Sequence, residues 1–293
     1  MPDYLTTKEV ANLLRIKERK VYDLAAKGGI PCSRAMGKLL FDRDSIEAWV
    51  AAGSPATMTA TPTTPRPPVI LGSHDPLLDW ALRESGAGLA TYCDGSFDGL
   101  DRFAAAEGVA TGLHIRNGDD ESSDATWNTA LVQQRFSGSA VVLAEWAWRT
   151  RGLIVRPEDA GVIGGLSALQ DRRVAHRQSS AGGQALFETM LTELNVTVDP
   201  TSSIARTETD AATAVSDGSV DAAFGLEAVC AQYRLAFVPL ITERFDLLVD
   251  RRAWFEAPFQ TFLKFCATAK FATHAARMAG YDVSGLGTIH FNG

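Results

Sequence analysis

Three short stretches rich in glycine and serine each follow an apolar run and precede a predicted helix. They are Gly72-Ser73-His74-Asp75, Gly95-Ser96-Phe97-Asp98 and Arg177-Gln178-Ser179-Ser180-Ala181-Gly182-Gly183. In open α/β sheets, ligands lie at the carboxyl ends of strands, where helix N-termini offer N–H donors to anions. One such loop also makes an ordinary turn. Three of them, with an arginine, favour a pocket for an oxyanion or a carboxylate.

Two histidines and two arginines could complete this pocket. His74 and His114 are predicted at strand ends that face one cleft. They either donate hydrogen bonds to an anion, which would raise their proton affinity, or bond to local backbone. Arg149 and Arg151 fall where the chain would cross into a second lobe, so each either reaches the ligand or ties the hinge. No third histidine or cysteine stands at ligand spacing, and we expect no metal site.

Two further clusters have ordinary structural explanations. Trp127, Trp146 and Trp148 could cage a cation, but buried aromatic residues usually belong to a core. Glu243-Arg244 and Asp246 could act as an acid–base cluster, yet such charges usually form a solvated or hinge ion pair. The sequence contains no G-x-S-x-G, G-x-x-x-x-G-K-[ST] or H-E-x-x-H motif. We therefore expect neither an enzyme nor a cofactor.

The loops must be positioned by an alternation of strands and helices that begins at Val69. Strands are predicted at 69–71, 89–92, 109–114, 139–143, 152–155, 173–175 and 222–224, with helices at 76–84, 99–107 and 184–194. Short strands alternating with helices predict an α/β fold with mostly parallel sheets. Residues 69–293 are long enough for two lobes, the second at about 150–240.

Residues 1–50 have a different pattern. Thr7 is a predicted N-cap, followed by Val10, Leu13 and Leu14 at the spacing of a buried helix stripe. A second helix is predicted over 18–27, so that the two short helices make a helix-turn-helix. A β-hairpin wing around 30–41 and a closing helix through Ile46, Trp49 and Val50 complete the unit.

Basic residues gather where this unit would meet DNA. The second helix of a helix-turn-helix enters the major groove, and its N-terminal residues meet bases and phosphates. The predicted contacts are Lys17, Arg19, Lys20 and Tyr22 on the helix, with Arg34 and Lys38 on the wing. One such module makes few contacts, so we expect a symmetric dimer on operator DNA. The alternative is a basic scaffold or protein-interaction unit.

A segment rich in proline and threonine separates these two regions. Residues 51–68 read AAGSPATMTATPTTPRPP, which is the composition of a linker between independently folded domains. Residues 1–50 contain nine basic and seven acidic residues, whereas residues 69–293 contain 18 basic and 28 acidic residues. Because residues 1–50 carry a net positive charge and residues 69–293 a net negative charge, we expect nucleic acid to contact only residues 1–50, here called the head.

The whole chain has the composition of a soluble globular protein, with 46% hydrophobic and 22% charged residues. It lacks an apolar run near the ~18 residues of a membrane span and lacks the pattern of a secretory signal. Its four cysteines form no C-x-x-C pair. These features predict a cytoplasmic protein with no membrane partner.

Two resemblances support this division. The first 50 residues, with LTTKEVANLLRI and VYDLAAKGGIPCSRAMGKLLFDRDSIEAWV, resemble the excisionase-like winged helix-turn-helix family of bacterial DNA-binding domains. Residues 69–288, with ILGSHDPLLDWAL, VAHRQSSAGGQALFETML and FVPLITERFDLLVD, resemble the bacterial periplasmic-binding-protein-like domain that is similar to molybdate- and tungstate-binding proteins. The resemblance implies a bilobed α/β domain of type II that closes on an oxyanion.

That resemblance also implies roles for individual residues. Ser73 and Ser96 would be hydroxyl donors from the first lobe, and Ser179, Ser180 and Gly182 donors from the second. Relatives often end the second-lobe loop with an arginine, where this chain has Gln184. Because charge-assisted hydrogen bonds are about twice as strong as neutral ones, this difference argues against simple molybdate sensing. The ligand is then either an oxyanion such as molybdate or tungstate held by neutral donors, or a weaker anion or small organic acid.

The sequence therefore predicts a ligand-responsive transcriptional regulator. A dimeric winged head would bind operator DNA, and the bilobed body would bind a small anionic effector. The alternative is an intracellular carrier or storage protein for small anions that does not regulate DNA.

Overall fold

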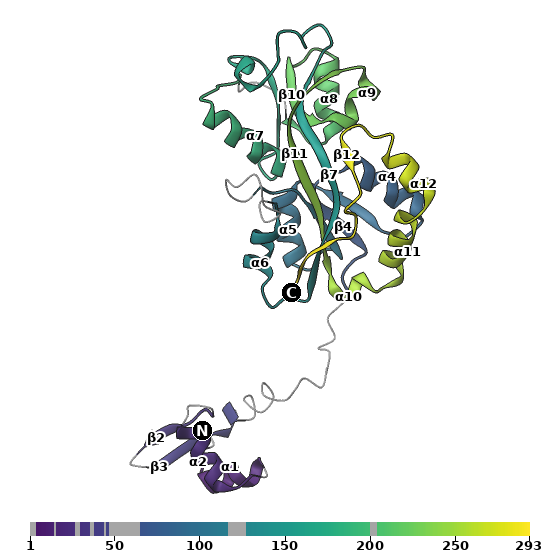
Figure 1. The fold of residues 1–293 in the computed structure, drawn as a ribbon. Coiled ribbons are helices and arrows are strands. Elements are labelled where there is room, and N and C mark those ends of the chain that lie inside the picture. The colour runs from purple at the N-terminus through teal and green to yellow at the C-terminus, as the bar shows by residue number, and fades with distance from the viewer. Residues whose placement is uncertain are drawn as a thin grey trace. The chain divides into compact units, whose positions relative to one another are not determined.

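A computed structural model describes residues 4–14, 16–26, 30–35, 38–43, 45–46, 65–116, 127–199 and 204–293. The chain divides into two compact units, Met1–Thr64 and Pro65–Gly293 (Figure 1). In the described part of the chain, no helix is long and apolar enough to span a membrane.

The N-terminal unit combines two short helices with a small antiparallel sheet. Its elements are β1 (Tyr4–Leu5), α1 (Thr7–Leu13), α2 (Glu18–Ala26), β2 (Ser33–Ala35) and β3 (Lys38–Asp42), with the strand order β1-β3-β2. The strands β2 and β3 pair as the predicted wing. Val10, Val21, Phe41 and Ile46 are fully buried and form the centre of its core.

The first helix begins one residue earlier than predicted. Thr6, not Thr7, is the N-cap, and its hydroxyl accepts from the Glu9 backbone N–H while the Glu9 carboxylate accepts from the Thr6 N–H. This reciprocal pair is a capping box. Leu13 was expected to be buried but is 43% exposed. Of the predicted closing helix, Trp49 and Val50 lie outside the described residues.

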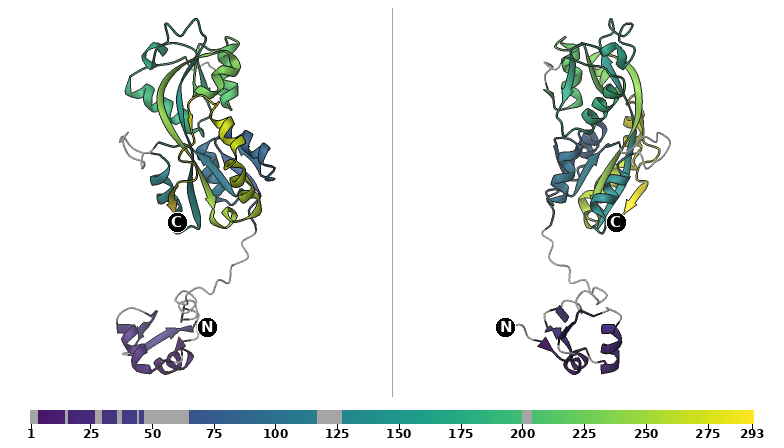
Figure 2. Two further views of the ribbon diagram at one scale, coloured as in Figure 1. Left: turned by 45° about the vertical axis from the view of Figure 1, so that its right-hand side comes forward. Right: turned by 90° about the vertical axis from the view of Figure 1, so that its left-hand side faces the viewer.

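The C-terminal unit is a bilobed α/β structure built on one continuous sheet. Its strands are β4 (Val69–Gly72), β5 (Ala90–Cys93), β6 (Ala110–Leu113), β7 (Val141–Val155), β8 (Val174–Arg177), β9 (Ile204–Ala205), β10 (Ala222–Leu226), β11 (Ala236–Asp250), β12 (Tyr281–Asp282) and β13 (Ile289–Asn292). The main order is β5-β4-β6-β11-β7-β10-β8-β9, and β12 and β13 also pair with β7. The two long strands β7 and β11 run through both lobes (Figures 1 and 2).

The continuous β7 corrects the sequence prediction, which placed separate strands at 139–143 and 152–155. Residues between them, including Ala147 and Arg149, pair with β11 in an antiparallel register. The expectation of mostly parallel sheets is wrong for the same reason. Parallel pairing holds among β4, β5 and β6 and among β8, β9 and β10, but β7 is antiparallel to β10, β11, β12 and β13.

Helices cover both faces of the sheet in each lobe. They are α4 (Pro76–Ser85), α5 (Ser96–Ala104), α6 (Thr129–Phe136), α7 (Gly182–Glu193), α8 (Glu208–Ser216), α9 (Cys230–Tyr233), α10 (Arg251–Trp254), α11 (Ala257–Cys266) and α12 (Ala269–Ala275). In the first lobe, α4, α11 and α12 cover one face and α5 and α6 the other (Figure 1). In the second lobe, α7 and α8 pack on separate cores.

The hydrophobic cores also show where two of the tryptophans lie. Trp146 and Trp127 are buried in two different hydrophobic clusters, so the cage of three tryptophans is not formed.

Arg66, near the end of the predicted linker, donates to the carbonyls of Phe103 and Gly108 and forms an ion pair with Asp250 at 3.3 Å. The chain is therefore fixed to the first lobe from Arg66 onward.

Candidate functional site between the lobes

Two serine hydroxyls meet at the end of the first-lobe strands. Ser73 follows β4 and Ser96 begins α5, and their Oγ atoms lie 2.7 Å apart in a buried position. The Ser96 Oγ also accepts from the His114 backbone N–H at 3.3 Å. The loops can approach because Gly72 has φ +98°, and a Cβ there would lie 2.3 Å from the Gly112 carbonyl. A single hydrogen bond between two hydroxyls uses one proton, so the other can serve a ligand.

The second lobe closes directly over this pair. A Cβ at Gly182, the first residue of α7, would lie 3.0 Å from the Ser96 Oγ and 2.8 Å from the His114 carbonyl. On the opposite side, Gly95 has φ +107°, and a Cβ there would lie 2.3 Å from the Ser180 carbonyl. Side chains at these positions would hold the lobes apart. The N-termini of α5 and α7 therefore converge only because both loops carry glycine.

Polar contacts across the cleft hold the lobes in this closed arrangement. The Ser180 hydroxyl donates to the Asp94 carbonyl, and the Phe97 N–H donates to the Ser180 carbonyl at 3.1 Å. Arg206 forms an ion pair with Asp94 at 2.8 Å. Ser180, predicted as a ligand donor, thus makes an interlobe bond, and Ser179 is exposed.

Arg149 lies in the hinge rather than open to the cleft. Its guanidinium is fully buried, with Nη1 2.8 Å from Asp75 Oδ2 and Nη2 bonded to Glu243. Asp75 also accepts from the Trp146 indole N–H at 3.0 Å and from the Tyr281 hydroxyl. Of the two roles predicted for Arg149, the structure favours the hinge tie.

Arg151 bridges the hinge to the second lobe. Its Nη2 lies 3.0 Å from both Glu208 Oε1 and Glu243 Oε1. Its Nη1 lies 3.2 Å from the place that a Cβ would occupy at Gly183, so the glycine leaves room above the guanidinium. Arg177, the predicted arginine of the second-lobe loop, pairs with the same Glu208 at 2.9 Å.

The buried arginines lower the pKa values of the carboxyl groups beside them. Burial raises the pKa of Glu208, but Arg151 and Arg177 outweigh it and bring that pKa to about 2. Burial likewise opposes the ionisation of Glu243, yet Arg151 and Arg149 hold its pKa well below the usual value. Glu208 and Glu243 are therefore ionised, and each of them is ion-paired with two of the three arginines.

His114 is part of this network, in a role that the sequence did not predict. Its Nδ1 lies 2.9 Å from Glu243 Oε2, and burial lowers the pKa of His114 more than Glu243 raises it. A neutral ring must give its one N–H to the ionised carboxylate, which leaves Nε2 as an acceptor. The expected donor role toward an anion thus requires protonation. His74 is half-buried, and its Nδ1 has no partner in the described residues.

Gln184, which stands where relatives often have arginine, supports its own loop. It is buried, its Oε1 accepts from the Arg177 N–H at 2.8 Å, and its Nε2 donates to Glu188 at 2.8 Å. The side chain is thus used within the second lobe.

Sequence reasoning missed Asp75 and Glu208 as site residues and left Arg151 undecided. Asp75 was visible as the end of a predicted loop, and it is also the N-cap of α4. Nothing in the sequence near Glu208 pointed to the cleft. In the described residues, no group of three or more histidine, cysteine, aspartate or glutamate side chains is placed to hold a metal ion.

Comparison with known proteins identifies both units. Residues 80–267 match the model of the PBP superfamily domain, the periplasmic-binding-protein superfamily. The chain belongs to the PBP superfamily. Residues 4–54 match a helix-turn-helix domain, so the predicted fold of a helix-turn-helix head and a bilobed PBP-like α/β body is confirmed. The molybdate and tungstate specificity is not part of either match.

This PBP superfamily chain is also similar to individual proteins. It is 23% identical to the uncharacterized protein YvgK of Bacillus subtilis (strain 168), over 97% of this chain and 96% of that one. A putative phosphate ABC transporter substrate-binding protein with bound phosphate from Clostridium perfringens has 12% identity and a TM-score of 0.51, covering 74% of this chain and 99% of that one. The CcmR regulatory domain of Synechocystis PCC6803, in complex with 2-PG, has 11% identity and a TM-score of 0.47, covering 67% and 92%.

Proposed function

We propose that this protein is a cytoplasmic, ligand-responsive transcriptional regulator. Its helix-turn-helix head binds operator DNA as a homodimer, and its PBP domain binds a small anion, either a tetrahedral oxyanion such as molybdate or tungstate or a small organic acid. The observation that carries the proposal is the approach of α7 to the Ser73–Ser96 hydroxyl pair, in a chain that also carries a helix-turn-helix domain.

Support for an anion comes from the donors that surround the pair. The N-termini of α5 and α7 converge at Ser96 and Gly182, and helix N-termini attract negative charge. The guanidinium of Arg151 lies next to Gly183. Because donors come from both lobes, an anion bound here would favour the closed state over the open one. Binding of this kind requires no turnover, and we propose that the protein is not an enzyme.

Support for DNA binding comes from the surface of α2. Lys17, Arg19 and Lys20 are exposed at its N-terminal end, and Tyr22 is 52% exposed while Val21 faces the core. Arg34 and Lys38 stand on the two strands of the wing. Lys17, Arg19 and Lys20 are thus exposed at the end of α2 from which a recognition helix contacts phosphates and bases.

The two functions require coupling between the units. An effector changes operator occupancy only if it binds the DNA-competent and DNA-incompetent states with different affinity, and typical couplings are about 1–3 kcal/mol. We propose that closure of the PBP domain changes the spacing of the two heads in the dimer.

A gel-shift series on the promoter region next to the gene tests the DNA role. The Arg19→Ala/Lys20→Ala protein should bind more weakly, and its salt dependence should fall by ~0.9 in log–log slope for each lost phosphate contact. Lys8→Ala, an exposed lysine of α1, is the control. Unchanged affinity and slope in the double variant would refute the DNA role of this tip. If the protein binds anions but shifts no promoter DNA, the result would instead favour the carrier or storage function.

A further inference from the structure

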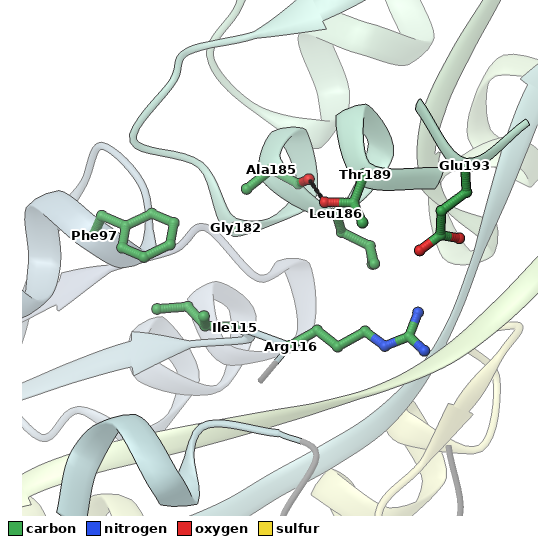
Figure 3. A pocket seen from close by; sticks show the side chains of 8 residues that line it. All are labelled: Phe97, Ile115, Arg116, Gly182, Ala185, Leu186, Thr189 and Glu193. Atoms are coloured by element: carbon green, nitrogen blue, oxygen red, sulfur yellow. Dashed lines mark hydrogen bonds between the residues drawn. The ribbon is translucent and has the colours of Figure 1, made fainter. Parts of the chain in front are cut away.

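A pocket lies beside the polar site and has walls from both lobes. It has a volume of about 170 Å³, and the first lobe contributes Phe97, Ile115 and Arg116. The second lobe contributes one face of α7, with Ala185, Leu186 and Thr189 (Figure 3). The Thr189 hydroxyl donates to the Ala185 carbonyl at 2.9 Å within its own helix, so this wall is apolar from Ala185 to Thr189, whereas Glu193 adds a charged group at the end of α7.

The pocket adjoins the hydroxyl pair. Phe97 directly follows Ser96, and Ile115 directly follows His114 in the chain. Gly182 lines the pocket and also lies against the Ser96 Oγ. A molecule whose polar end reaches the donors near Ser96 could therefore place an apolar body between Phe97 and α7.

The charges of the cleft favour a singly charged head. Arg149, Arg151 and Arg177 are each ion-paired with Asp75, Glu208 or Glu243, and these six groups balance. Arg116 and Glu193, which line the pocket, add one charge of each sign. A doubly charged tetrahedral oxyanion would add two uncompensated charges to this buried network, whereas a carboxylate adds one. Apolar burial in the adjacent pocket then supplies affinity that a small inorganic ion cannot gain.

We propose that the effector is a small organic monocarboxylic acid with a branched or aromatic apolar body, seated between Phe97 and α7. This inference rests on the proposed function and names the ligand class of the same cleft. The pocket is small compared with the ~300–1,000 Å³ of drug-sized ligand sites, so the body is a short side chain and not a fused ring system. The walls come from both lobes, so the apolar body itself contributes to closure.

Binding of four probes to the full-length protein tests the ligand class. They are acetate, 3-methylbutanoate, phenylacetate and the uncharged 3-methylbutanamide, measured by calorimetry and by the shift in Tm. Each buried CH₂ contributes about fourfold in affinity, so 3-methylbutanoate should bind at least ~10-fold more tightly than acetate. The amide should bind at least ~10-fold more weakly than the acid, because it lacks the charge.

Two variants tie this selectivity to the pocket. Ala185→Phe fills it from the half-buried face of α7 and should remove the advantage of the larger acids. Ala272→Phe, at an exposed position of α12, should keep it. The Tm of each protein without ligand shows that it is folded.

The inference is overturned if no organic acid binds, or if Ala185→Phe retains the full preference for larger acids. It is also overturned if molybdate, sulfate or phosphate binds both variants equally and more tightly than any acid. That last result would leave the proposed anion-responsive regulator intact. The regulator itself fails separately, if the gel shifts show no operator binding or no response of that binding to any anion.

Discussion

Glu243 Oε2 lies 2.9 Å from His114 Nδ1, and this contact fixes which nitrogen of the histidine ring carries the proton. The carboxylate is ionised and can only accept, so Nδ1 donates and Nε2 keeps its lone pair. Arg149 and Arg151 bind the other oxygen of the same carboxylate. Glu243 thus connects Arg149 of the hinge, His114 of the cleft and Arg151, which reaches the second lobe.

Anion binding should therefore be linked to proton uptake. Burial lowers the pKa of His114, so the ring is neutral near neutral pH in the unliganded protein, and a bound anion raises that pKa. Affinity should increase as pH falls, by up to about tenfold per pH unit. Calorimetry in buffers of different ionisation enthalpy measures the uptake directly. His114→Gln should bind with no such uptake, and equal uptake in this variant would rule out His114 as the acceptor of the proton.

Removal of the hydroxyl pair should weaken ligand binding. Ser73→Ala with Ser96→Ala deletes the one hydroxyl proton that remains for an anion, a hydrogen bond worth about 1.5–2 kcal/mol, so the dissociation constant should rise about 10- to 30-fold. The shift in Tm should be mostly lost at ligand concentrations close to the wild-type dissociation constant. If the double variant keeps the full shift, the ligand binds elsewhere.

A side chain at Gly95 should prevent closure. In Gly95→Ala the Cβ would lie 2.3 Å from the Ser180 carbonyl, and the backbone there has φ +107°. We expect at least ~10-fold weaker ligand binding, since closure and binding are coupled, and a larger radius of gyration by solution scattering. Gly88→Ala is the control, because its φ is +70° but nothing lies within 4 Å of the new Cβ. Equal affinity in the two variants would show that this contact does not control closure.

Asp246 should give the body a distinct pH dependence of stability. Burial raises the pKa of Asp246 to about 6, against the opposing effects of Arg244, Asn128 and His290. The pKa of Asp246 in the folded protein lies above its pKa in the unfolded chain. The stabilisation of the folded protein by protonated Asp246 is therefore complete below the unfolded pKa and is lost as pH rises through about 6.

Comparison with Asp246→Asn isolates this term. The unfolding free energy of the wild type minus that of the variant should decrease by about 1.4 kcal/mol between about pH 5 and about pH 7.5. Urea unfolding at several pH values measures it. A difference that stays constant or increases over this range would contradict the raised pKa.

Local patterns in the sequence predicted the loops of the site but not its long-range partners. The strand-to-helix loops around Ser73 and Ser96 could be predicted because glycine, serine and apolar periodicity act over a few residues. The union of residues 141–155 into one strand depends on pairing with 236–250, nearly a hundred residues later. Tertiary pairing of this kind overrides local patterns.

The same separation along the chain explains why the role of Arg149 could not be decided from the sequence. The sequence left Arg149 with two possible roles, a ligand contact or a hinge tie, because no partner for it lies nearby in the chain. Its actual partners, Asp75 and Glu243, lie more than seventy residues away on either side. Trp127 and Trp146 were likewise candidates for a cage, and only the packing of two separate cores shows that they do not meet.

The anchoring of Arg66 has a practical consequence for producing the sensor alone. A fragment that starts at Val69, as the composition of the linker suggests, would lack this guanidinium. The carbonyls of Phe103 and Gly108 would lose their donor, and Asp250 would lose its ion pair. A truncated protein intended for ligand screening should therefore begin no later than Pro65.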